Sequence, residues 1–108
     1  MITIDEFLKV DMRVGTILEA SLNLKAHKPA YKLVIDFGNL GIKTSSAQIT
    51  EVYQIEELIG KQIIAVVNFP PRQVANVMSE VLVLGTESNQ GVVLLTPSTK
   101  VKNGDKVS

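Results

Sequence analysis

The sequence predicts an all-β fold, and three features of its hydrophobic pattern support this prediction. Apolar and polar residues alternate with a period of two in the first half of the chain, which is typical of half-buried strands. These segments are followed by a helical segment and then by further apolar runs. Strands and helices do not alternate, which disfavours a doubly wound sheet. Three strands, a helix and two strands is the order of an OB-fold, a five-stranded Greek-key barrel.

A short helix and a long first strand open the chain. Thr3 and Glu6 match a capping box, so we expect a helix that continues to about Val10. From 12 to 22 the hydrophobic period changes to two, which predicts the first strand. Gly15 lies within this strand and permits the bend that a small barrel requires.

The later elements follow from the same patterns. The second strand is expected at 31–37, and the third, which is rich in hydroxyl side chains, at 41–49. Residues 50–59 have helical spacing and end at Gly60, which predicts a helix between strands three and four. The remaining strands are expected at 62–69, at 79–84 and, as a carboxy-terminal extension of the barrel, at 92–96.

The composition indicates one domain, residues 1–108. The chain is 45% hydrophobic and 20% charged, which suits a small globular domain. It has no cysteine, so disulfides, thiolate metal sites and thiol catalysis are excluded. The amino terminus is acidic and lacks the pattern of a secretory signal, and no apolar run approaches bilayer length. We therefore expect a soluble cytoplasmic protein that does not insert into membranes.

The later strands are apolar on both faces. In the fourth strand Ile63 and Ala65 point to one side, while Ile64 and Val66 point to the other. A small barrel has only one interior, so the outer apolar face needs a cover. The amino-terminal helix and the chain ends could supply it within one chain. Because such patches are unusual on a monomer, we expect an isologous homodimer instead.

Few residues suit catalysis. The single histidine, His27, lies in a lysine-rich loop without cysteines or spaced carboxylates nearby, so we expect it to be solvated. Motifs for phosphate-binding loops, dinucleotide sites and serine nucleophiles are absent. The net charge is zero, which argues against a protein that coats nucleic acid. The sequence therefore favours a binding protein over an enzyme, with no catalytic residues, no metal site and no cofactor.

Five segments carry a resemblance that covers nearly the whole chain. They are Asp11 to Ile17, Tyr31 to Gly38, Thr44 to Thr50, Ile64 to Arg72, and Ser79 to Leu84. Together they resemble the tRNA-binding-domain family and, within it, the CsaA group of bacterial and archaeal chaperones. The resemblance implies an OB-fold homodimer that binds unfolded or precursor proteins and the secretion motor SecA. The wider family binds tRNA by its shape at the outside corner, which is the alternative function.

For peptide binding, the two consecutive prolines form a rigid corner between strands. Phe69, Pro70 and Pro71 would give an apolar wall, although the alternation of Phe69 with Val67 is also compatible with a core position. Hydrogen bonds to a peptide backbone would come from polar side chains around this corner. These candidate residues are Asn68, Arg72, Ser45, Ser46 and Gln48.

For tRNA binding, OB-folds use the face of strands two and three and the neighbouring loops. The candidate phosphate contacts are Arg13, Lys32, Lys43 and Arg72, and the candidate sugar or base contacts are Ser45, Ser46, Gln48, Asn68 and Ser79. Arg13 has an alternative role in an ion pair with Asp11, Asp36 or Glu80. Glu80 completes the candidate set, either as a ligand contact or as a hydrogen-bond acceptor within the fold.

Overall fold

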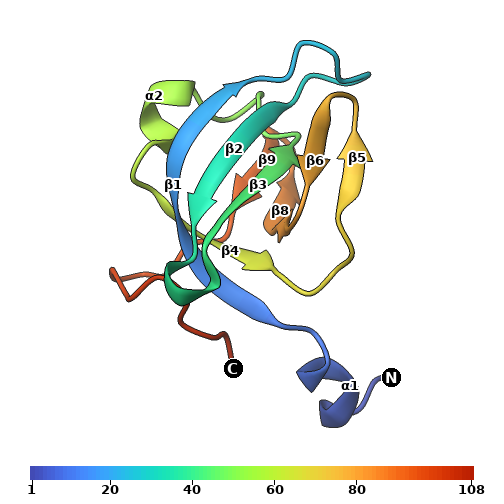
Figure 1. Ribbon diagram of the computed structural model, residues 1–108, viewed down its shortest axis with the longest axis vertical. Helices are drawn as coiled ribbons and strands as arrows, with labels where there is room; N and C mark the ends of the chain where they lie inside the picture. Colours follow the sequence, from blue (N-terminus) through green and yellow to red (C-terminus); the bar gives the residue numbers. More distant parts are fainter.

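A five-stranded antiparallel sheet curls into a barrel at the centre of the molecule (Figure 1). The computed structural model describes residues 1–108. The strand order in this sheet is β3-β2-β1-β4-β7. The bounds are β1 (Met12–Leu22), β2 (Tyr31–Asp36), β3 (Ile42–Ala47), β4 (Gln62–Val66) and β7 (Leu82–Val83). The OB-like barrel that the sequence predicts is confirmed, and β1 has the predicted bounds.

Inward-facing side chains of β1, β2 and β4 fill the barrel. Leu33, Ile35 and Phe37 are fully buried because they share one face of the second strand and its end. Gly15 makes room for two of them, since a Cβ atom there would lie 2.6 Å from Ile35 Cγ2 and 2.7 Å from Phe37 Cε1. The register between β1 and β2 shifts between Ile17 and Glu19, which bends the long strand around the core.

The helices are short. The helix α1 (Ile4–Leu8) begins at Thr3 with the predicted capping box, contains no buried residue and extends away from the barrel (Figure 1). The expected helix at 50–59 is reduced to α2 (Ile55–Leu58), whose Leu58 is fully buried beneath it. A 3-10 turn, η1 (Gly38–Leu40), joins β2 to β3. No helix is both long enough and apolar enough to cross a bilayer.

The region between β4 and β7 differs from the sequence-based expectation. The strand β4 ends at Val66, before the expected end at 69, and a hairpin of β5 (Arg72–Val74) and β6 (Val77–Ser79) follows. The expected single strand at 79–84 is divided between β6 and β7. The chain leaves the ladder to β7 after Val66, where the Val67 N–H donates to the Asp11 carbonyl at 2.8 Å, and Pro70 and Pro71 have no N–H group with which to resume pairing.

The carboxy-terminal part adds a hairpin to the barrel, and its last residues pair with β1. The hairpin consists of β8 (Gly85–Ser88) and β9 (Gly91–Leu94), and β9 corresponds to the expected extension at 92–96. The last residues run along β1, where Val107 N–H donates to the Met12 carbonyl at 2.9 Å and Lys106 forms a bridge with Arg13. The chain end therefore covers part of the outer edge of β1 in the same molecule.

Candidate functional site

A groove of about 470 Å³ lies beside the proline corner. Its lining residues are Phe69, Pro70, Pro71, Arg72, Ser79, Glu80, Val81 and Leu82. The first six belong to the site that the sequence analysis proposed, so the structure brings these candidates together. Val81 and Leu82 also line the groove but are not among the residues predicted from the sequence, because an apolar residue in a strand normally indicates core. The only available signal was that this strand is apolar on both faces.

The groove exists because two neighbouring chain segments separate. The strands β4 and β7 pair as far as Val66 and Leu82, and pairing of β5 with β6 begins at Arg72 and Ser79. Between these pairs the chain makes the proline corner on one side and a short connection through Glu80 on the other. Figure 1 shows the corner as the wide loop that leads from β4 to β5. Backbone hydrogen bonds do not close this gap, so side chains form its walls.

The walls combine exposed apolar surface with charge. Phe69 is 52% exposed and Leu82 is 49% exposed, which places Phe69 in the wall and not in the core. The chain has one ion pair, between Arg13 and Asp11, so the exposed Arg72 guanidinium has no acidic partner. An extended ligand would therefore meet apolar side chains and one free cationic group in the same groove.

Glu80 lies both in the groove and at the place where β3 meets the segment 79–81. We call this contact between residues 44–46 and 79–81 the seam of the barrel. The Glu80 Oε1 accepts a hydrogen bond from the Thr44 N–H at 3.0 Å, and the Glu80 N–H donates to the Thr44 carbonyl at 2.8 Å. The strand β3 thus meets the segment after β6 through a carboxylate as well as through backbone. A carboxylate that already accepts these bonds has less capacity for a ligand. Glu80 therefore serves as the internal acceptor that the sequence analysis considered as its alternative role.

Three serines complete the same seam. Ser45 is fully buried, and its hydroxyl donates to the Val81 carbonyl at 3.1 Å. The Ser79 hydroxyl accepts from the Ser46 N–H at 3.1 Å. Ser45 is therefore inaccessible to a ligand, contrary to its proposed role in backbone or sugar binding. The physical reason is that β3 lacks a complete ladder to β6, so hydroxyl groups satisfy the backbone groups there.

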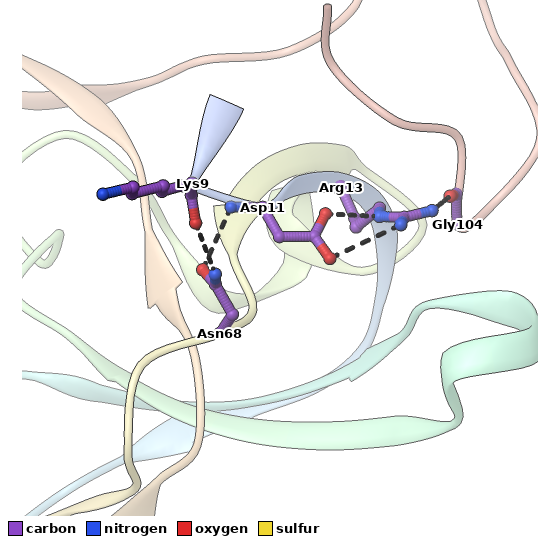
Figure 2. Close-up of polar contacts among 5 residues, drawn as sticks. All are labelled: Lys9, Asp11, Arg13, Asn68 and Gly104. Atoms are coloured by element: carbon purple, nitrogen blue, oxygen red, sulfur yellow. Dashed lines mark hydrogen bonds and ion pairs between the residues drawn. The ribbon is translucent and has the colours of Figure 1, made fainter. Parts of the chain in front are cut away.

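Asn68 and Arg13 form a cluster at the base of the amino-terminal helix (Figure 2). The Asn68 Oδ1 accepts from the Asp11 N–H at 3.0 Å, and its Nδ2 donates to the Lys9 carbonyl at 2.7 Å. Arg13 Nε donates to Asp11 at 2.6 Å, and Arg13 Nη1 donates to the Gly104 carbonyl at 3.1 Å. The hydrogen bond that Arg13 donates to the Asp11 carboxylate raises the pKa of Arg13 above its ordinary value. Both residues are thus engaged inside the chain, and the ion-pair alternative for Arg13 is confirmed.

The remaining candidates lie elsewhere. Lys32 is exposed on β2, where it lines a second groove of about 490 Å³ with Leu18 and Ile59. Lys43 is half-buried on β3, and Gln48 lies in a third, more polar groove of about 460 Å³. The candidate set therefore divides among the proline corner, the barrel seam, the base of the helix and two further surfaces. The structure contains no group of three or more His, Cys, Asp or Glu residues that could hold a metal ion.

Sequence comparison identifies the domain family of the chain. Residues 12–106 match the family described as "Putative tRNA binding domain". The chain is 37% identical over 107 residues to the methionine–tRNA ligase of Methanococcus vannielii and 38% identical over 107 residues to that of Bacteroides fragilis. These matches cover 99% and 98% of the chain but only 16% of each ligase. They therefore concern one part of those enzymes.

Solved structures give full-length matches. The CsaA chaperone protein of Picrophilus torridus is 58% identical with a TM-score of 0.95, and both chains are covered completely. The chaperone CsaA of Bacillus anthracis is 52% identical with a TM-score of 0.94, covering 100% of this chain and 99% of that one. The MetRS related protein of Pyrococcus horikoshii is 33% identical with a TM-score of 0.88, covering 100% and 98%. The chain belongs to the tRNA-binding-domain family and shares the complete fold of the CsaA chaperones.

Proposed function

We propose that this protein is a CsaA-like chaperone of the cytoplasm that binds unfolded or precursor proteins during secretion, with SecA as a further partner. The groove beside the proline corner takes an extended segment of the client. The observation that carries this proposal is the half-exposed apolar wall of Phe69 and Leu82 next to the unpaired Arg72. The complete structural similarity to two proteins named as CsaA chaperones supports it.

The groove suits clients of varied sequence. Two prolines restrict the backbone of one wall, so little conformational entropy is lost when a ligand binds. Their missing N–H groups also prevent a client from pairing with this wall as an added strand. Recognition then depends on burial of apolar side chains, which is non-directional and tolerates different sequences. Arg72 adds a preference for clients with a carboxylate or carbonyl group near the bound segment.

We further propose that the chain acts as a homodimer and that α1 packs against a second copy. The helix has no buried residue within its own chain, and Ile4 and Leu8 are 69% and 55% exposed. Exposed apolar side chains on a projecting helix favour contact with another surface. Sedimentation equilibrium at micromolar concentration should give twice the mass of one chain, and Ile4→Glu with Leu8→Glu should give one chain. A single-chain mass for the unaltered protein would remove the dimer from this proposal.

Suppression of client aggregation tests the groove. Phe69→Ala combined with Arg72→Glu removes apolar wall and reverses its charge, so we expect much weaker protection of denatured citrate synthase in a light-scattering assay. Leu22→Ala is the matched control, because Leu22 is 54% exposed but does not line the groove. Unchanged protection by the double variant would show that clients bind elsewhere.

tRNA binding is the second candidate function, and the match to the tRNA-binding-domain family favours it. Exposed Lys32 and Arg72 would contact phosphates, and two-fold symmetry would double this small positive footprint. Filter binding of bulk tRNA should then weaken as the salt concentration rises from roughly 50 to 200 mM. Lys32→Ala should reduce the slope of log affinity against log salt by about 1. An absent or salt-independent response would exclude phosphate recognition.

A further inference from the structure

We propose that Asn68 is a positioning residue that couples the amino-terminal helix to the client groove. This inference rests on the proposed chaperone function. Asn68 directly precedes Phe69 and the two prolines, yet it does not line the groove. Its carboxamide instead joins the chain segment at the base of α1, where it bonds both Lys9 and Asp11 (Figure 2).

The contact is specific to a carboxamide. At 3.0 Å the Oδ1 atom accepts from the Asp11 N–H, and at 2.7 Å the Nδ2 atom donates to the Lys9 carbonyl. A backbone bond runs beside them, from the Val67 N–H to the Asp11 carbonyl at 2.8 Å. Lys9 is also the residue that caps the end of α1. The end of the helix and the start of the groove wall are thus held together over a few residues.

The connection through Asn68 fixes the direction of α1 on one side and the position of Phe69 on the other. On one side, α1 has no buried residue, so the base of the helix determines its direction. On the other side, Phe69 directly follows Asn68, and its backbone is restricted because it precedes Pro70, so a shift of Asn68 moves Phe69 with it. Asp11 is itself fixed by Arg13, which reaches the Gly104 carbonyl in the carboxy-terminal turn. Docking of α1 on a second copy and the position of the groove wall therefore depend on the same residues.

A double-mutant cycle measures this coupling. The probe is a short fluorescein-labelled peptide containing leucine and glutamate, which matches the apolar wall and the free Arg72, and it is too short to reach two grooves. Binding is followed by fluorescence anisotropy. Leu8→Glu should weaken peptide binding about fivefold, at the lower end of typical couplings between sites. In the Asn68→Ala background the same change should have less than about a twofold effect, because the connection is gone. Equal effects of Leu8→Glu in both backgrounds would overturn the inference.

Two further variants separate positioning from general damage. Asn68→Asp keeps an acceptor for the Asp11 N–H but places an oxygen where Nδ2 donates to the Lys9 carbonyl, so it should reduce the coupling without removing the side chain. Asn89→Ala changes an exposed asparagine in the β8–β9 turn and should leave the coupling intact. Failure of the unaltered protein to bind the peptide at all would refute the proposed function together with this inference. Binding that is insensitive to Leu8→Glu would refute the inference alone.

Discussion

Removal of the Glu80 carboxylate should open the seam of the barrel and destabilise the fold. Glu80 lies between β6 and β7, and its Oε1 accepts from the Thr44 N–H at 3.0 Å. In Glu80→Ala this half-buried N–H group loses its partner in the chain. The Thr44 hydroxyl keeps a partner, because it can donate to the Met78 carbonyl at 2.7 Å. The variant therefore removes one strong hydrogen bond between the two sides of the seam.

The size of the effect follows from this one bond. A hydrogen bond to a charged group contributes about 1.5–3 kcal/mol to stability. Both residues are half-buried, so partial access of water favours the lower part of this range, about 1.5–2 kcal/mol. For a domain of this size, that loss corresponds to a decrease in Tm of roughly 5–15 °C.

Urea and thermal unfolding followed by circular dichroism measure the change in the free energy of unfolding. Glu80→Gln is the matched control, because its amide oxygen can still accept from the Thr44 N–H, and it should lose less than about 1 kcal/mol. A Glu80→Ala protein as stable as the unaltered chain would refute the assignment of Glu80 to the seam. Equal destabilisation by both variants would show that the negative charge, and not the hydrogen bond, is the important property.

Two further predictions concern backbone positions. Gly15→Ala places a Cβ atom 2.6 Å from Ile35 Cγ2, so overpacking should destabilise the chain by about 1–3 kcal/mol in urea unfolding, and an unchanged midpoint would contradict this packing. Ala75 has a φ of 53° at the first turn position of the β5–β6 hairpin, where glycine is preferred. Ala75→Gly should therefore raise the free energy of unfolding by about 0.5–1 kcal/mol, and a lower Tm would contradict strain at this turn.

The regular strands could be predicted well because burial of one face imposes a period of two. The bounds of β1 and the start of β2 at Tyr31 follow directly from that alternation. The hairpin at β5 and β6 could not be recognised, because its turn at Ala75 and Asn76 lacks the glycine that marks such turns. The helix at 50–59 was overestimated because its apolar spacing also suits a loop that packs on the core, as Tyr53 does.

The candidate site could be predicted only in part. The proline corner is visible in the sequence because proline has a fixed φ and no N–H group, and the corner does border the groove. Serines, acids and amides carry no such local information, because their role depends on the partner that the fold supplies. Ser46 and Ser79 are 33 residues apart, and Asp11 and Asn68 are 57 apart.

The sequence by itself determined the barrel, the capped amino-terminal helix, the rigid corner and the family. These features depend on local periodicity, on the chemistry of single residues and on short motifs. Only the tertiary structure decided which polar side chains close the barrel, which hold the helix base and which remain free at the groove. Hydrogen bonds between distant segments make that decision, because a buried donor or acceptor must find a partner wherever the fold brings one within reach.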